Sequence, residues 1–418
     1  MNSVYVSLFI AIAVYLVLGF YGLQVLKTLF KNPWIHTVYR VLMFVLPSLL
    51  AYVIYTRTPG ESFSGFPSIV AGTFMAFFLL ITILAIFMLL EDIYRLIAYM
   101  MNHLVGVENE GQSYMPSRRK FVSGLALFTG AVPFSGLLYG MYKGKHNYQV
   151  LSYELEYEDL PESFDGYRIV QISDLHAGSW VKSTDYERVK YGIELINKQE
   201  GDLIVFTGDM VNDRADEVYD WSHLLSTLKA TDGKFSILGN HDYGEYYGPW
   251  RDDEEARQAN LFNLLTEQKN MGFEPLLNAN RTLERNGEQI NLVGVENWGA
   301  GRFAKKGDLN KATEGLAEDS FKVLLSHDPS HWREQVLPHP HRFHLTLSGH
   351  THGFQFGVEI PQLKWSPVQY RYKEWAGIYE EGGEFINVNR GFGFLGYPGR
   401  VGIWPEISVI TLKKKRLT

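Results

Sequence analysis

Long uncharged, apolar stretches characterise the first third of the chain. Three of them, residues 3–26, 62–90 and 121–142, contain no Asp, Glu, Lys or Arg, and a fourth, about residues 35–56, contains only Arg40. A bilayer core requires about 20 apolar residues per helix, so each stretch is long enough to cross it. The pattern therefore predicts an all-α membrane domain over residues 1–142, with four transmembrane helices at about residues 4–26, 35–56, 66–90 and 121–142.

The charges between these stretches predict how the membrane domain is oriented. Basic residues concentrate in the first and third loops, whereas the second loop, residues 57–67, offers only Arg57. The basic residues of the first and third loops are Lys27, Lys31, Arg40, Arg95, Arg118, Arg119 and Lys120. Basic loops stay in the cytoplasm, so the amino terminus and everything after residue 142 are expected on the periplasmic or extracellular side of the inner (cell) membrane.

Residues 117–122, Ser-Arg-Arg-Lys-Phe-Val, permit two interpretations. The segment resembles the twin-arginine export motif and precedes an apolar segment, as that pathway requires. The same arginines can equally serve as a charge cluster that sets topology. The sequence does not decide between export of a folded domain and a purely topological role.

The second half of the chain first alternates short apolar runs with helix-like stretches, and strands dominate later. Five runs rich in apolar and β-branched residues, mostly bounded by Gly or Asp, predict buried strands that begin at Arg168, Leu203, Phe235, Phe321 and Phe343. Apolar spacing predicts helices at residues 184–199, 218–228 and 254–265, and further strands are expected at 290–295, 384–388 and 407–412. The expected α/β fold is two packed sheets with helices outside, a four-layer αββα sandwich over residues 150–418.

Charge and cysteine content narrow the possible functions of the second half. Residues 1–140 contain eight basic and five acidic residues, and the remaining 31 basic and 41 acidic residues give residues 141–418 a net charge of −10. Because nucleic-acid phosphates bind basic surfaces, no nucleic-acid partner is expected. The chain has no cysteine, so any metal ion must be held by nitrogen and oxygen donors.

Residues of metal-ligating types directly follow the predicted strands. They stand in the blocks Asp174-Leu-His176, Gly208-Asp209, Gly239-Asn240-His241-Asp242, His327 and Gly349-His350-Thr-His352. An α/β sheet keeps its active-site crevice at the carboxyl ends of its strands, so these side chains are expected to converge. A carboxylate can bridge two ions, and Asp209 is the expected bridge. Two divalent ions about 3.5–4 Å apart can clamp an in-line phosphoryl displacement, which indicates a metal-dependent hydrolase.

In their order these blocks resemble the calcineurin-like metallophosphoesterase superfamily, whose pattern is D-x-H, G-D, G-N-H-[DE], H and G-H-x-H. The resemblance covers about residues 150–412 and favours the membrane-anchored bacterial branch. It implies two metal ions, the first held by Asp174, His176, Asp209 and His352 and the second by Asp209, Asn240, His327 and His350. It further implies that His241 donates a hydrogen bond or proton near the leaving oxygen, with Asp242 orienting it.

The stretch 365–404, rich in Trp, Tyr and Gly, is expected to form a long surface region with short strands that could border a substrate groove. Its Arg390-Gly-Phe-Gly segment, followed by Arg400, resembles the closing segment of membrane-linked members of the superfamily. Either arginine could bind a phosphate through two parallel hydrogen bonds. The alternative for both is a place on a solvated loop or in a structural ion pair.

Together these features predict a membrane-anchored, binuclear metal-dependent phosphoesterase. The resemblance implies that a hydroxide bridging the ions attacks phosphodiester or phosphoanhydride bonds, and the membrane tether makes lipid-linked substrates a candidate. The alternatives are a phosphomonoesterase or sugar-nucleotide pyrophosphatase of the same superfamily, and a non-catalytic metal-binding membrane sensor. Structural metal sites are usually closed and hold a single ion, whereas this chain offers a bridging carboxylate and an additional His241. This difference disfavours the sensor. The two divalent ions could be Mn, Zn, Fe or Mg, since imidazole and carboxylate suit several metals.

Overall fold

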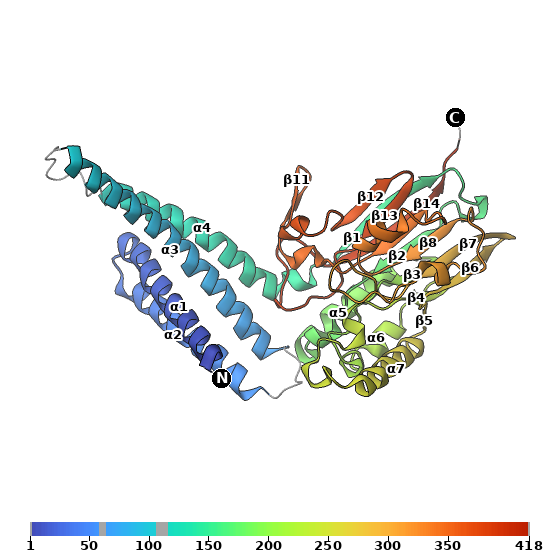
Figure 1. The fold of residues 1–418 in the computed structure, drawn as a ribbon, viewed down its shortest axis with the longest axis horizontal. Coiled ribbons are helices and arrows are strands. Elements are labelled where there is room, and N and C mark those ends of the chain that lie inside the picture. The colour runs from blue at the N-terminus through green and yellow to red at the C-terminus, as the bar shows by residue number, and fades with distance from the viewer. Residues whose placement is uncertain (1, 58–63, 106–115, 417–418) are drawn as a thin grey trace. The chain divides into compact units, whose positions relative to one another are not determined.

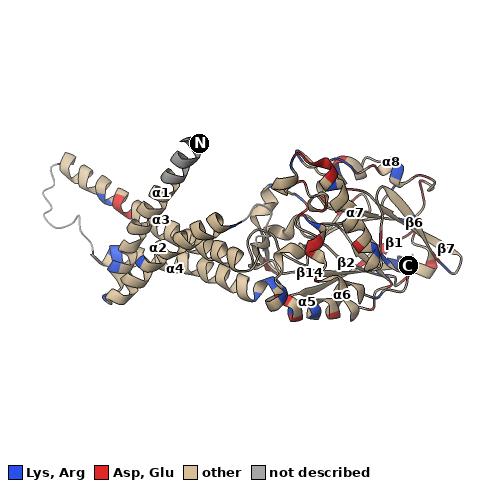
Figure 2. Cartoon of the chain, turned by 90° about the horizontal axis from the view of Figure 1, so that it is seen from below, with Lys and Arg blue, Asp and Glu red and all other residues tan. Residues whose placement is uncertain are grey.

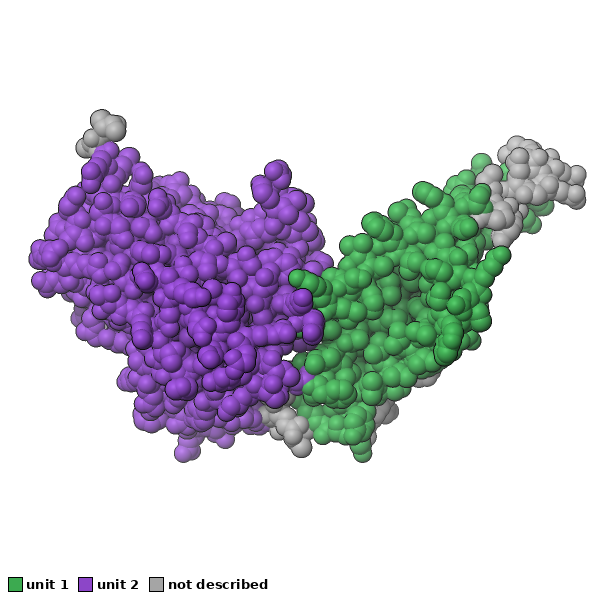
Figure 3. Space-filling view, turned by 180° about the vertical axis from the view of Figure 1, so that it is seen from behind, with its two compact units in different colours: residues 1–57, 66–141 green, residues 58–65, 142–418 purple. Residues whose placement is uncertain are grey.

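The computed structural model describes residues 2–57, 64–105 and 116–416 of the chain. These residues form two compact units, shown in different colours in Figure 3. Residues 1–57 and 66–141 make up the membrane unit, and residues 58–65 and 142–418 make up the α/β unit. Each unit contains its own cluster of buried hydrophobic side chains.

The membrane unit consists of α1 (Asn2–Leu29), α2 (Pro33–Thr56), α3 (Phe66–Val105) and α4 (Pro116–Tyr142) (Figure 1). All four are long and apolar enough to cross a bilayer, as the sequence predicts. Met43, Ile81 and Ala126 are fully buried between the helices, while many apolar side chains face outward. Figure 2 shows few charged residues on the described parts of these helices, and they gather toward one end of α3 and α4. A helix that is apolar on all sides is typical of a membrane span.

The third helix is longer than the sequence predicts. The expected end was residue 90, before the pair Glu91-Asp92, whereas α3 continues to Val105. Both carboxylates are paired: Glu91 lies 3.0 Å from Arg118 Nη2 and 3.2 Å from Arg119 Nη1, and Asp92 lies 3.1 Å from Arg119 Nη1. Glu is a good helix former, so paired carboxylates interrupt the apolar run without ending the helix. The two arginines of the export-like segment therefore join α4 to α3.

The α/β unit contains two six-stranded sheets and a two-stranded hairpin. The order of the first sheet is β1 (Gln149–Tyr157), β14 (Glu406–Lys414), β2 (Arg168–Ile172), β3 (Leu203–Phe206), β4 (Lys234–Ser236) and β5 (Phe273–Pro275). The order of the second sheet is β12 (Gly377–Glu381), β13 (Glu384–Val388), β9 (Leu345–Ser348), β8 (Lys322–Leu325), β7 (Glu288–Gly294) and β6 (Ala279–Arg285). Neighbouring strands are parallel except for β14–β2, β12–β13 and β6–β7. The hairpin pairs β10 (Val358–Ile360) with β11 (Leu363–Trp365).

The two sheets face each other, and helices cover their outer sides, which gives the four layers that the sequence predicts. Ile169 and Val205 of the first sheet and Leu325 and Leu347 of the second belong to one buried cluster between the sheets. Helices α5 (Lys182–Asn197), α6 (Ser222–Ser226) and α7 (Glu254–Asn270) lie on the first sheet, and α8 (Leu309–Ala312) lies on the second. Strands buried on both faces are nearly continuously apolar, which is why the motif strands were visible in the sequence.

The short strands expected within residues 365–404 are present as β12, the edge strand of the second sheet, and its neighbour β13. The prediction of a long surface region is wrong for much of the segment, because residues such as Trp375 and Ile403 belong to a small buried cluster. The glycines that indicated a loop instead permit close packing of the backbone. A Cβ atom on Gly402 would lie only 2.0 Å from the Gly357 carbonyl oxygen. Close backbone approach, and not exposure, explains this glycine.

Candidate metal centre

Five strands of the two sheets lead to the predicted metal-ligating residues. Strands β2, β3 and β4 are neighbours in the first sheet, and they are followed by Asp174 and His176, by Asp209 and by Asn240. Strands β8 and β9 are neighbours in the second sheet, and they are followed by His327 and by His350 and His352. The loops at these strand ends are hydrogen bonded to one another, from Asp174 N to Gly208 O and from Gly349 N to His327 O, both at 2.9 Å.

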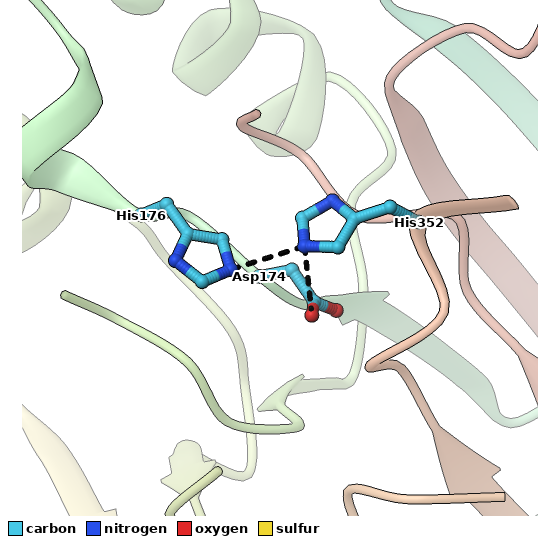
Figure 4. A group of neighbouring side chains, drawn as sticks. All are labelled: Asp174, His176 and His352. Carbon is cyan, nitrogen blue, oxygen red and sulfur yellow. Dashed lines mark hydrogen bonds and ion pairs between the residues drawn. The ribbon is translucent and has the colours of Figure 1, made fainter. Parts of the chain in front are cut away.

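Asp174, His176 and His352 form the first group of donor atoms, and all three side chains are buried. Their donor atoms lie within 4.8 Å of one another. Figure 4 shows the three side chains pointing toward one another. The Nε2 atoms of His176 and His352 are 3.0 Å apart, and His352 Nε2 is 3.4 Å from Asp174 Oδ1. Ligands bound to one ion at about 2.1 Å lie about 3 Å from each other, so this spacing suits a single cation.

Asp209, His327 and His350 form the second group, and their donor atoms also lie within 4.8 Å of one another. Oδ2 of Asp209 is 3.2 Å from His327 Nε2 in this group. The same oxygen is 3.6 Å from Nε2 of His176 in the first group. One carboxylate oxygen therefore faces both groups, which is the position required of a bridging ligand.

The donor atoms present fit two divalent cations. Asn240 Oδ1 is buried without a hydrogen-bond partner, while Asn240 Nδ2 donates to the Tyr246 hydroxyl at 3.0 Å. A buried oxygen left unpaired costs free energy unless another group, such as a metal ion, satisfies it. The set of imidazole, carboxylate and amide donors suits Zn, Mn, Fe or Mg. Asn240 would complete the second group, and Asp209 would contribute to both.

Five of the seven predicted ligand residues have a left-handed backbone. The φ angles are 51° for Asp174, 46° for His176, 59° for Asp209, 69° for His350 and 50° for His352. Non-glycine residues rarely adopt this conformation, and each instance costs about 1 kcal/mol or more. Gly208, with φ 97°, lies so close to Gly239 that a Cβ would be 2.6 Å from its nitrogen.

Burial and neighbouring charges set the protonation of the ligands. Burial raises the pKa of Asp174 to about 7 and lowers the pKa of His176 to about 3. Burial also acts to raise the pKa of Asp209, but the imidazoles of His327 and His241 outweigh it and hold that pKa well below its usual range. His176 is therefore neutral with a free lone pair, and Asp209 is ionised, which are the states that bind metal ions.

His241 lies beside both groups, but Asp242 does not orient it, so that prediction is wrong. His241 Nδ1 is 2.7 Å from the carbonyl oxygen of Asn212, which can only accept, so Nδ1 carries a proton and Nε2 is the free nitrogen. Asp242 instead accepts hydrogen bonds from four backbone amides: Gly239, Asp209, Met210 and Val211. Its carboxylate thus fastens the loop after β3 to the loop after β4.

The two arginines predicted to bind substrate are engaged within the protein. Arg390 is 4% exposed, and its Nε donates to Glu359 Oε2 at 2.9 Å while its backbone amide donates to Glu406 at 3.0 Å. Arg400 is fully buried, donates to the carbonyl oxygen of Gly393, and lies 3.1 Å from His352 Nδ1. Arg390 thus forms a structural ion pair with Glu359, which was the alternative to phosphate binding. Arg400 acts on the first group of ligands through His352.

Two residues beside the second group were not predicted. The Tyr372 hydroxyl is 2.8 Å from His350 Nε2, and Asp328 Oδ2 is 3.5 Å from the same nitrogen. Asp328 follows His327 directly, so the rule that selected strand-end residues could have selected it too. Tyr372 lies far along the chain and carries no sequence pattern that indicates this contact.

Comparisons with known proteins agree with this geometry. Residues 167–354 match the family model described as calcineurin-like phosphoesterase, and residues 4–145 match a probable transmembrane domain of such enzymes. The uncharacterized metallophosphoesterase YkuE of Bacillus subtilis is 32% identical over 308 residues, which cover 71% of this chain and 98% of YkuE. A transmembrane protein with metallophosphoesterase domain from Danio rerio is 30% identical over 287 residues, covering 66% of this chain and 60% of that protein.

The similarity also includes a mammalian protein. The Bos taurus transmembrane protein with metallophosphoesterase domain is 27% identical over 358 residues, covering 83% of this chain and 74% of that protein. The long alignment with YkuE, the two family models and the convergent donor atoms lead to one assignment. The chain is a membrane protein that belongs to the calcineurin-like metallophosphoesterases, enzymes that hydrolyse phosphoric ester bonds.

Proposed function

We propose that this protein uses two divalent cations to hydrolyse phosphodiester or phosphoanhydride bonds in substrates at the membrane surface. The observation that carries the proposal is the pair of donor groups that share Asp209. Asp174, His176, Asp209 and His352 would hold one ion, and Asp209, Asn240, His327 and His350 would hold the other. When bound, two such ions neutralise charge on the phosphoryl oxygens. They also lower the pKa of a bound water, so that hydroxide is available at neutral pH.

His241 would act as the proton donor beside these ions. His241 lies with its ring centroid 4.9 Å from that of His176, and its Nδ1 is fixed by the carbonyl of Asn212. A protonated imidazole held in this way can donate from Nε2 to the leaving oxygen without losing its support. The ring of Tyr246 packs beside this imidazole, with a centroid distance of 4.6 Å.

Hydrolysis of simple aryl phosphates tests the proposal directly. The protein in lipid nanodiscs would be assayed on a bis-aryl phosphodiester and on an aryl phosphomonoester, with chelator and after return of Mn, Zn, Fe or Mg. We expect hydrolysis of the diester that requires metal, and that is lost in Asp209→Asn. The control variant is Asp216→Asn, an exposed acid in the same region, which should keep full activity. Metal-independent turnover, or full activity of Asp209→Asn, would contradict the proposal, and a preference for the monoester would favour the phosphomonoesterase alternative.

The location of the site on the periplasmic or extracellular side rests on the distribution of basic residues between the helices. It supports lipid-linked phosphate esters as substrates, because soluble cytoplasmic nucleotides would not reach such a site. A reporter enzyme that is active only outside the cytoplasm, fused to the carboxyl terminus, should be active. An active cytoplasmic reporter at the same position would instead favour a nucleotide substrate.

A further inference from the structure

The β10–β11 hairpin of the α/β unit carries an unusual apolar surface. Among the exposed large hydrophobic side chains of the described α/β unit, the three aliphatic ones all lie on this hairpin. They are Val358, Ile360 and Leu363, at 39%, 54% and 50% exposure. Figure 1 shows the hairpin, labelled β11, projecting from the body of the unit. Exposed apolar residues that gather on one projecting element indicate an interaction site.

The strand register divides the hairpin into two faces. Because side chains of a strand alternate, opposite residues of the two strands share a face. One face carries the pairs Val358–Trp365 and Ile360–Leu363, and the other carries the pair Glu359–Lys364. The first set is the apolar hairpin face. Tyr370, which is 80% exposed, adds a second aromatic side chain because its hydroxyl lies 3.5 Å from Trp365 Nε1.

The charged face is fastened to the body of the unit. Glu359 accepts from Arg390 Nε at 2.9 Å, and Arg390 is 4% exposed. Lys364 Nζ donates to the carbonyl oxygen of Ala376, and burial lowers its pKa to about 8. Soluble proteins normally place the apolar face of a hairpin inward and the charged face outward. On this hairpin the charged side chains contact the body of the unit while both residues stay exposed, and Val358, Ile360 and Leu363 are exposed as well. The hairpin therefore presents an apolar face to its surroundings, and that face suits a less polar environment than water.

The hairpin shares a cavity with β1, the strand that follows the last membrane helix along the chain. A cavity of about 550 Å³ is lined both by Ile360 of the hairpin and by Gln149 and Leu151 at the start of β1. Only residues 143–148 separate β1 from Tyr142, the last residue of α4. A segment of that length spans at most about 20–25 Å. The length of the chain therefore keeps the start of β1 within about 20–25 Å of the end of α4.

We propose that the apolar hairpin face inserts into the interfacial region of the bilayer that holds α1–α4. Aliphatic side chains flanked by Trp, Tyr and Lys are typical of protein segments that lie at this boundary. The hairpin follows the loop of His352 directly, and the chain from His352 to Ile360 spans at most about 28 Å. Insertion would hold the metal centre beside the lipid headgroups, where, on the proposed function, a lipid-borne phosphate ester would be bound.

The natural absence of cysteine allows a direct test with single labels. Ile360→Cys and Leu363→Cys would each carry an environment-sensitive fluorophore in the full chain, in nanodiscs whose acyl chains bear nitroxide quenchers. Phe262→Cys, at an exposed position in α7, is the negative control, and Phe128→Cys, at an exposed position in α4, is the positive control. We expect labels at positions 360 and 363 to be quenched like the label at 128 and unlike the label at 262.

Quenching at 360 and 363 equal to that at 262 would overturn the proposal. So would a label that is shielded from water equally in detergent and in lipid but is not quenched by nitroxide lipids, because the hairpin would then contact protein. Shielding that disappears when each nanodisc holds a single copy would assign the surface to a second copy instead. None of these measurements requires hydrolysis, so failure here and failure of the proposed function are distinguishable.

Discussion

The four hydrogen bonds that Asp242 accepts make it the most informative side chain to change. In Asp242→Asn, Oδ1 can still accept from Met210 and Val211, but the new amide nitrogen replaces Oδ2, the acceptor for Asp209 and Gly239. The buried N–H groups of Asp209 and Gly239 then face a donor instead of an acceptor. Each unsatisfied group costs about 1–3 kcal/mol, so the free energy of unfolding should fall by about 2–6 kcal/mol. In a unit of this size 1 kcal/mol corresponds to about 2–4 °C, so the Tm should fall by on the order of 10 °C.

Thermal unfolding of chelator-treated protein in nanodiscs, followed by intrinsic fluorescence, measures this loss. Asp216→Asn is the matched control, because its side chain is 51% exposed and its ion pair with Arg214 should contribute less than about 1 kcal/mol. Hydrogen exchange at the amides of Asp209 and Gly239 should accelerate only in Asp242→Asn. An unchanged Tm combined with slower turnover would refute the structural argument and restore Asp242 as the residue that orients His241.

Three further predictions concern the metal centre. Asp174 and His327 must each lose a proton to bind metal, and their pKa values are raised to about 7 and about 10. Metal affinity should therefore fall about tenfold per pH unit from about pH 10 to about pH 7 and more steeply below about pH 7, as competition with a chromophoric chelator would show. A flat profile would contradict this assignment. His241→Gln should lower kcat by about 10²–10⁴-fold with metal content unchanged by elemental analysis, and a loss of metal would assign it a ligand role instead. Arg400→Met should weaken binding of one of the two ions by about 10–100-fold through His352, whereas equal weakening of both would indicate a general defect in folding.

The parts of the site that could be predicted from sequence follow from one topological rule. Buried parallel strands are continuously apolar, so the runs before Asp174, Asp209 and His327 were visible, and strand ends in an α/β fold lie at a common edge. The order of the two sheets did not have to be known. The four membrane helices were equally visible, because length without charge is a property of composition alone.

Contacts that join distant segments could not be predicted in this way. The extension of α3 depends on Glu91 meeting Arg118, and the role of Asp242 depends on the amides of a neighbouring loop. Tyr372 reaches His350 across 22 residues of chain, and Arg390 meets Glu359 across 31. Such pairings depend on how the loops pack in three dimensions, and no periodicity in the sequence encodes them.

The left-handed ligands have a consequence for how this family would lose its activity. The backbone is left-handed at Asp174, His176, Asp209, His350 and His352, a conformation that glycine or asparagine adopts at lower cost. Metal binding requires the side chains that stand there and so maintains the costlier residues. Once a descendant no longer needs its cations, selection no longer maintains these side chains, but the conformational cost remains. Inactive descendants should therefore acquire Gly or Asn at these five positions before they change Asn240, whose φ of −68° is ordinary. The order in which non-catalytic relatives replace these residues would thus show which ligands had required a costly backbone conformation.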